Sequence, residues 1–452
     1  MMDSEHFYSV GFTRRGDRMV ADITGETRIR LDECGLLTAL FHTIPPRAGD
    51  LLRIGLSVYA ADRLARRDWQ DQSGGSRTMH LEVGVTEPDF WSDEHTVAPV
   101  RDALELLSGD AWHLRFYYRQ PDTDYNLGFP PIQHPRICLY SSGLDSAAGL
   151  ATQLHARRSA MLTVTTYHQA SQDKRVPEQL RQLAHRYGVD VRSIIVRTAF
   201  DMPPQLRKQE LTQRCRSFLF AAMAGAIACA EQSSSIEVYE SGVGAINLPL
   251  MHGMATGART TKSTHPHFLR LMSDLVSRVA ERRIDLILPH RDRTKAEIVR
   301  TLAEDGLADL ARSTVSCVHY PVRGKAKQCG YCPACIGRRQ AMIVAGVDES
   351  DGAYEYDLFG SSQTVNAIEP AKLENLKATL MQVERLGELR GEPLPEWFLQ
   401  YALGTRVVED RDALRGWVDV LLRYRAEWLD VIALGQSKGW KWASLLPTSA
   451  AA

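Results

Sequence analysis

Apolar and polar side chains alternate with a period of two in the first 120 residues. Apolar residues occupy every second position from Met79 to Val85 and again from Trp112 to Tyr118, where His113 and Arg115 fall on the opposite face. A period of two indicates half-buried β-strands. With a helix expected near 97–107, the pattern predicts a β-rich N-terminal domain over residues 1–120. Recognition or assembly and a passive structural extension are both open as its role.

Four prolines mark a linker at residues 121–135, and strand and helix patterns then alternate over residues 136–349. Such alternation indicates βα units on a parallel sheet with helices on both faces, which is an α/β fold. Strands are expected at 137–140, 161–167, 193–196, 236–239 and 285–288, and helices at 146–158, 177–187 and 212–230.

The C-terminal region, residues 350–452, carries apolar residues at helical spacing. Two stripes stand out, and the second includes two tryptophans. We interpret both as packing stripes of a helical extension and not as cofactor sites. The stripes are Leu373, Leu376, Leu380, Val383 and Leu386, and Leu414, Trp417, Leu421, Tyr424, Trp428 and Val431.

Composition and charge narrow the classes of function. The chain has 452 residues, enough for two or three domains, with 54 Lys plus Arg against 55 Asp plus Glu. This balance gives no overall attraction to nucleic acid or an anionic membrane, so neither is an expected partner. The longest apolar run, 218–230, is shorter than the roughly 20 residues that cross a bilayer. Because residues 1–10 also lack the features of a secretory signal, we expect a cytoplasmic protein.

A strand followed by small, hydroxyl-bearing residues and a helix start gives the sharpest chemical signal. Backbone N–H groups, serine hydroxyls and a helix N-terminus together can bind phosphate. A carboxylate among them repels a bare phosphate but suits a bridging Mg²⁺. The alternative is an ordinary βα turn whose aspartate or serine caps the helix. The segment is Tyr140, Ser141, Ser142, Gly143, Leu144, Asp145 and Ser146.

Four cysteines fall within 19 residues, at Cys317, Cys329, Cys332 and Cys335. Four thiolates suit a tetrahedral ion, and an all-thiolate site with no open position is typical of structural Zn²⁺. An iron–sulfur cluster uses the same ligands, and free reduced thiols are the remaining alternative.

The segment Tyr140–Ser146 resembles the Ser-Gly-Gly-x-Asp-Ser loop of the PP-loop ATP pyrophosphatases, which cleave ATP between its α and β phosphates. Ser142 stands where that family usually has glycine, and a positive φ there would cost a serine about 1 kcal/mol or more. Together with the cysteine spacing, the loop resembles the QueC family over about residues 135–345. Those enzymes make 7-cyano-7-deazaguanine from 7-carboxy-7-deazaguanine, ATP and ammonia, and hold a structural zinc.

The resemblance implies roles for further residues. Arg216 and Lys295 match positions near the phosphates or the substrate carboxylate, and Tyr167 lies in the segment that would hold adenine and ribose. The resemblance implies a catalytic group of Asp145, Lys295 and Arg216 with ATP and Mg²⁺, and formation of an acyl-adenylate. Surface or helix-end positions are the plain alternative for Arg216 and Lys295.

Glycines, histidines and cations mix in residues 247–267, which we interpret as a substrate loop with Asn247, His252, Arg259 and His265. The flanking regions resemble the QueC-like proteins of antiphage operons (Qat and type IV CBASS), which implies a protein partner from a defence operon. The accepting amine is then ammonia or a protein amine. A PP-loop enzyme that modifies tRNA and an inactive scaffold are the alternatives.

Overall fold

The computed structural model describes most of the chain. The described residues are 5–15, 18–23, 27–31, 44–68, 75–121, 136–167, 172–201, 209–210, 212–249, 262–322, 324, 327–348, 351, 354–360 and 370–443. Their strands form one ten-stranded sheet in the order β10-β9-β6-β7-β8-β3-β2-β1-β4-β5. The protein is therefore a mixed α/β structure, as the sequence predicts.

The strands are β1 (Glu5–Arg15), β2 (Arg18–Ile23), β3 (Thr27–Leu31), β4 (Thr78–Val85), β5 (Ala111–Tyr118), β6 (Ile137–Leu139), β7 (Met161–Tyr167), β8 (Val191–Asp201), β9 (Ser235–Val238) and β10 (Asp285–Ile287). The helices are α2 (Pro46–Leu64), α3 (Pro88–Ser92), α4 (Glu94–Ser108), α5 (Leu144–Ala156), α6 (Gln172–Tyr187), α7 (Arg216–Ala230), α8 (Gly242–Ile246), α9 (Pro266–Ala280), α10 (Lys295–Glu304), α11 (Ala308–Ser313), α12 (Pro333–Val344), α13 (Pro370–Arg385), α14 (Glu396–Gly404) and α15 (Arg411–Ser437), with the 3₁₀ helix η5 (Leu386–Arg390).

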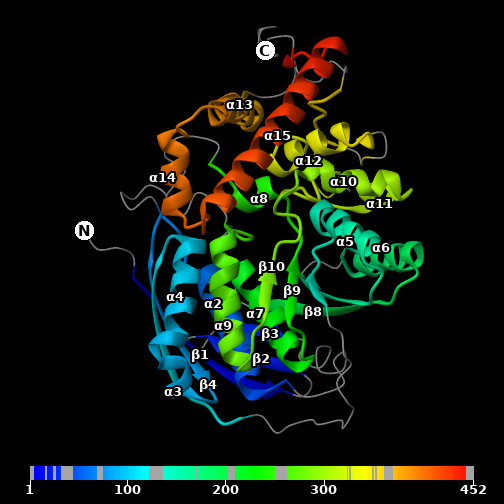
Figure 1. Cartoon of the computed structure of the whole chain (residues 1–452). Helices are drawn as coiled ribbons and strands as arrows, with labels where there is room; N and C mark the ends of the chain where they lie inside the picture. The colour runs from blue at the N-terminus through cyan, green and yellow to red at the C-terminus, as the bar shows by residue number, and fades with distance from the viewer. Residues whose placement is uncertain are drawn as a thin grey trace.

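The five strands β8-β7-β6-β9-β10 are parallel and are covered on both faces. One core contains residues of α7 and α9, and the other contains residues of α5, α6 and α10. The chain leaves β6 through α5 on one face and reaches β9 through α7 on the other (Figure 1). In such a sheet, a crevice forms where the connections diverge, beyond the carboxyl ends of β6 and β9.

The N-terminal strands continue this sheet, because β3 pairs antiparallel with β8. The expected strands are present as β4 and β5, with Met79 and Trp112 buried. Helix α2 was not predicted from the sequence, because it is buried around its whole circumference against β4 and α7 and so lacks an amphipathic period. The apolar residues of α2 belong to the same hydrophobic core as those of the parallel strands. A separate domain at residues 1–120 stays a prediction.

The C-terminal helices lie at the carboxyl end of the parallel strands, and α15 runs above α8 and beside α12 (Figure 1). Trp417 packs with α8 and α14, and Trp428 packs with α12 and α13. These contacts confirm the second helical stripe as a packing stripe. No helix in the described ranges has both the length and the apolar character needed to span a membrane.

Candidate functional site

A cavity of about 190 Å³ lies at the carboxyl ends of β6 and β9. It is lined by the loop after β6, the loop after β9, and the facing sides of α7 and α9. The lining residues are Leu139, Tyr140, Ser141, Gly143, Asp145, Ser146, Ser217, Phe220, Ala221, Val238, Tyr239, Glu240, Ser263, Thr264, Phe268 and Leu269. The cavity thus occupies the crevice that the strand order creates. We call it the loop cavity.

Small residues allow the loop after β6 to fold tightly onto the start of α5. Ser141 Oγ lies 3.2 Å from Ser146 Oγ, and the amide of Gly143 donates to Ser141 Oγ over 3.4 Å. Ser142 has φ of 59°, so the left-handed conformation considered in the sequence analysis is present. Its side chain does not line the cavity. The left-handed backbone at Ser142 therefore does not block the cavity.

Helix α5 also approaches β9 closely. A Cβ on Gly149 would lie 2.6 Å from Cβ of Tyr239, so only glycine allows this packing. The side chain of Leu144 is buried in the core beneath α5, and only its backbone belongs to the loop. Tyr140 is buried as well, and its hydroxyl donates to Gln179 over 2.9 Å. The loop is thus held from below by apolar packing and by buried hydrogen bonds, including one that the hydroxyl of Thr165 donates to the carbonyl oxygen of Tyr140 over 2.8 Å.

Three charged groups meet at the loop cavity. Lys295, at the first turn of α10, donates to Asp145 Oδ2 over 2.9 Å, although the two residues are 150 positions apart. Burial disfavours the charged form of Lys295, but Asp145 and Glu240 outweigh this effect and raise its pKa. Burial, followed by the charge of Asp145, raises the pKa of Glu240 to about 7. One cation therefore lies beside two carboxylates.

The other oxygen of Asp145, Oδ1, is buried and has no hydrogen-bond partner among the described residues. A buried carboxylate oxygen without a donor is costly unless a ligand or water satisfies it. Carboxylate oxygens are the ligands that Mg²⁺ prefers. The oxygen therefore fits the magnesium site expected at Asp145.

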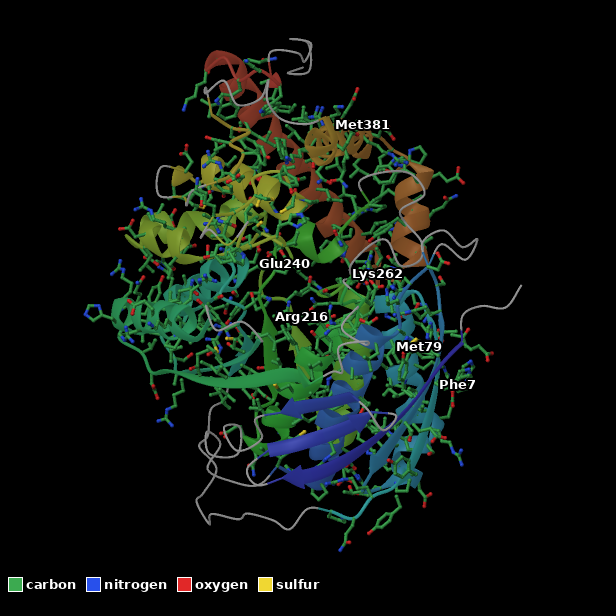
Figure 2. The ribbon with its side chains drawn as sticks, turned by 180° about the vertical axis from the view of Figure 1, so that it is seen from behind. Phe7, Met79, Arg216, Glu240, Lys262 and Met381 are labelled. Atoms are coloured by element: carbon green, nitrogen blue, oxygen red, sulfur yellow. The ribbon has the colours of Figure 1, made fainter. Side chains whose placement is uncertain are left out.

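Arg216 begins α7, and its guanidinium carbon lies 4.9 Å from the centroid of the Phe220 ring. It forms no ion pair within the described part of the chain, and burial lowers its pKa. Its neighbour Ser217 lines the loop cavity, whereas Arg216 itself does not. In Figure 2, Arg216 and Glu240 lie in the central part of the molecule, between the sheet and the C-terminal helices. A role for Arg216 at the phosphates stays a prediction.

The expected substrate loop is described only at its two ends. His252 and Arg259 lie outside the described residues, as does the side chain of Tyr167. His265 caps α9 by accepting from the amide of His267, and burial lowers its pKa to about 3, so it is neutral at pH 7. Asn247 ends α8 with φ of 45°.

Asn247 lines a second cavity, of about 180 Å³, between α8, α12, α13 and α15. Its lining also includes Lys295, whose amino group reaches the loop cavity through Asp145. The other lining residues are Ser241, Val243, Gly244, Leu248, Pro333, Ile336, Gly337, Gln340, Thr379, Gln382, Leu421 and Tyr424. Two residues of the second helical stripe, Leu421 and Tyr424, thus also face a cavity. We call it the helix cavity.

The four clustered cysteines come together in the fold. Their sulfur atoms all lie within 4.8 Å of one another and are buried. A tetrahedral ion with Zn–S bonds of about 2.3 Å places its sulfurs roughly 3.8 Å apart, and the Cys329 and Cys335 sulfurs are 3.8 Å apart. This spacing fits a single ion better than an iron–sulfur cluster, whose thiolates are farther apart. Gly330 is required here, because a Cβ would lie 1.8 Å from the oxygen of Tyr356.

The cysteine cluster is joined to the loop after β6. Residue Val315, two positions before Cys317, donates its amide to the carbonyl oxygen of Ser142 over 3.3 Å. Arg338 on α12 is fully buried and bridges Asp351 and Thr314. Arg338 therefore has a structural role, and an ion at the cysteines would stabilise a segment that supports the loop.

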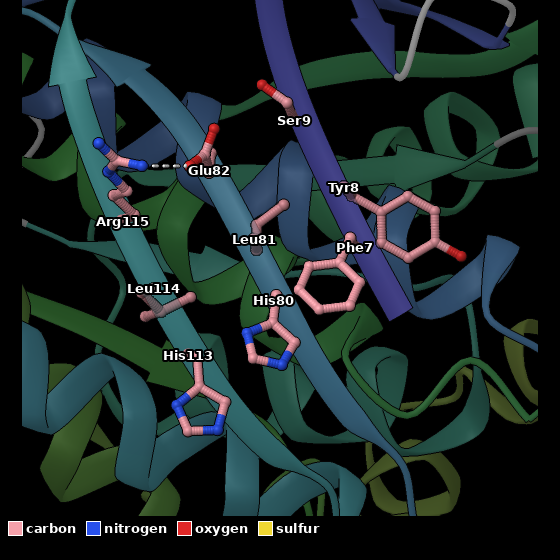
Figure 3. Close-up of a pocket in the computed structure, with 9 residues that line it drawn as sticks. All are labelled: Phe7, Tyr8, Ser9, His80, Leu81, Glu82, His113, Leu114 and Arg115. Atoms are coloured by element: carbon pink, nitrogen blue, oxygen red, sulfur yellow. Dashed lines mark hydrogen bonds and ion pairs between the residues drawn. The ribbon is translucent and has the colours of Figure 1, made fainter. Parts of the chain in front are cut away.

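A third hollow, of about 410 Å³, lies on the exposed side of β1, β4 and β5 (Figure 3). It shares no lining residue with the loop cavity or the helix cavity. The rings of Phe7 and His80 stack with centroids 4.2 Å apart, and those of His80 and His113 with centroids 4.7 Å apart. Arg115 donates to Glu82 on the next strand over 3.0 Å. The N-terminal strands thus present an aromatic surface, with Phe7 63% exposed.

The sequence analysis missed Glu240 and the helix cavity. Glu240 follows β9 as Ser141 follows β6, and a polar residue directly after a buried strand is the signal that could have identified it. The helix cavity has no such signal, because its residues come from five helices that are distant in sequence.

Residues 256–346 match the family model of the queuosine biosynthesis protein QueC. The matched segment contains Lys295 and the four cysteines, and it ends before the C-terminal helices. It does not reach the loop at 140–146. A search of curated proteins finds no match. The family match supports a QueC-like protein.

Proposed function

We propose that this protein uses ATP to adenylate the carboxylate of a 7-deazaguanine, releases pyrophosphate, and passes the acyl group to an amine. The observation that carries the proposal is the loop Tyr140–Ser146 at the end of β6, with Lys295 bound to Asp145 beside a cavity. The QueC match supports the class of substrate.

In this function the loop binds pyrophosphate. The amides at the start of α5 and the hydroxyls of Ser141 and Ser146 are donors that suit phosphate oxygens. Lys295 adds a positive charge, and its bond to Asp145 fixes its position. Such fixed donors stabilise the charge that develops on the leaving pyrophosphate.

Asp145 would hold Mg²⁺ through Oδ1, the oxygen without a protein donor. When bound, the ion would neutralise phosphate charge. The four cysteines would hold zinc in a structural site, since they leave no open position for a substrate.

The test measures exchange of labelled pyrophosphate into ATP with 7-carboxy-7-deazaguanine as the acid. Wild type should catalyse exchange, and Asp145→Asn, which keeps the side-chain shape, should lose it by a factor of at least about 100. Ser142→Gly should exchange at a rate close to that of wild type, because Ser142 does not line the cavity. Absence of exchange with any deazapurine acid would contradict the proposal and favour a scaffold.

The acceptor and the setting are a further part of the proposal. We assign the reaction to antiphage defence, with an amine of a partner protein as the acceptor. The regions outside residues 256–346 would be available to bind that partner. Intact-mass analysis of co-expressed operon proteins tests this part: mass added to a partner supports it, and a free nitrile or amide product contradicts it.

A further inference from the structure

The side chain of Glu240 packs closely against the start of α8. Its Oε1 accepts from the amide of Ser241 over 3.0 Å and lies against the first turn of α8. A Cβ on Gly244 would come within 2.2 Å of this oxygen, so the glycine leaves the space that the carboxylate fills. The conformation of Glu240 is therefore set by its surroundings.

This carboxylate lies at the wall between the two cavities. Glu240 lines the loop cavity, whereas Ser241 and Gly244, which contact it, line the helix cavity. Lys295 lines the helix cavity and binds Asp145, which lines the loop cavity. A group in the helix cavity would thus approach the reaction centre past Glu240 and Lys295.

The size and charge of the helix cavity restrict its ligand. A water-sized molecule needs about 10–15 Å³, so the 180 Å³ of this cavity is enough for a molecule much larger than ammonia. Within the described residues, Lys295 is the only charged residue in its lining, beside the amides of Gln340 and Gln382 and the hydroxyl of Thr379. A neighbouring cation lowers the pKa of an ammonium group, so a bound amine gives up its proton more readily.

We infer that the helix cavity binds the amine acceptor and that Glu240 is the base that removes its proton. The inference rests on the proposed function. Glu240 takes one proton from the ammonium group, and the freed nitrogen lone pair forms the C–N bond to the acyl carbon. The bond from that carbon to the adenylate oxygen breaks, AMP leaves with the electron pair, and the second nitrogen proton passes to the AMP phosphate.

Asp145 is the less suitable base, because one of its oxygens is bound to Lys295. Within the described residues, Glu240 accepts hydrogen bonds only from the neutral amide and hydroxyl of Ser241. A carboxylate that is bound less tightly accepts a proton more readily.

The first experiment compares wild type with Glu240→Gln in pyrophosphate exchange and in transfer to three amines: ammonia, glycinamide and hydroxylamine. Hydroxylamine is mostly unprotonated at neutral pH and needs no base. We expect transfer to ammonia and glycinamide to fall about 100-fold more than exchange does, and transfer to hydroxylamine to fall no more than exchange. Equal loss with all three amines, or loss of exchange, would overturn the role of Glu240 as a base.

A second pair of variants tests the cavity without changing a charged group. Gly337 faces the helix cavity from α12, and a Cβ there meets no atom within 4 Å, so Gly337→Leu should fill the cavity while the helix remains intact. Gly416→Leu, on the exposed side of α15, is the matched control. We expect Gly337→Leu to slow transfer to glycinamide at least tenfold while exchange stays unchanged.

The outcomes separate the two proposals. If wild type shows no exchange, the proposed function and this inference both fail. If exchange occurs and Gly337→Leu transfers glycinamide as fast as the control, the acceptor does not use the helix cavity. If Gly337→Leu slows glycinamide but not ammonia, the cavity serves the larger amine. Equal slowing of both amines shows that ammonia enters by the same route.

Discussion

Replacement of Glu240 by glutamine should make the protein more stable above neutral pH. Burial and the charge of Asp145 raise the pKa of Glu240 from its ordinary value of 4.5 to about 7. The folded protein therefore keeps a proton that the unfolded chain releases between these two pH values. Stability from this group is fully present below pH 4.5 and is lost as the pH rises to about 7.

The magnitude follows from the same two pKa values. A tenfold change in proton affinity corresponds to about 1.4 kcal/mol, so the ionised carboxylate destabilises the folded state by up to about 3 kcal/mol above pH 7. Glutamine resembles the protonated acid and does not ionise. We expect Glu240→Gln to match wild type near pH 4.5 and to exceed its free energy of unfolding by up to about 3 kcal/mol at pH 8.

Urea unfolding from pH 4.5 to 8.5 measures this difference. Subtraction of the two curves removes the contributions of groups that both proteins share, including the cysteine cluster. Glu374→Gln, on the exposed side of α13 where Glu374 pairs with Lys377 over 2.9 Å, is the control and should parallel wild type. If the Glu240→Gln curve also runs parallel to wild type, the carboxylate is not held in an unfavourable environment and the reasoning is wrong.

Three further predictions concern the packing around the site. Lys295→Met should lower the free energy of unfolding by about 3 kcal/mol, because two carboxylates lose their cation. Adding Asp145→Asn to this variant should restore part of the lost stability. Strictly additive effects of the two substitutions in urea unfolding would argue against the ion pair. Arg338→Met should cost about 3 kcal/mol, because it removes the buried cation that bonds to Asp351 and Thr314, and it should speed zinc loss to a chelator. Unchanged zinc retention would count against the link to the cysteines. Gly149→Ala should cost about 1–3 kcal/mol, since its Cβ would clash with the end of β9; a melting temperature equal to that of wild type would refute the close packing.

The sequence alone determined features whose parts lie close together in the chain. The cysteine cluster was predictable because three ligands fall within seven residues and fix a local turn, with Gly330 as its strained position. The loop at 140–146 was predictable because a strand, small residues and a helix start are consecutive. The apolar stripes of the C-terminal region were predictable because α13 and α15 are each buried on one side.

Only the tertiary structure decided what lies beside these local features. Strand order places β9 next to β6, and this brings Glu240 to the loop although the two are far apart in the sequence. The helix cavity depends on how α13 and α15 pack over α8 and α12. Helix α2 stayed hidden because burial on every side removes the periodic contrast between apolar and polar positions on which sequence interpretation depends.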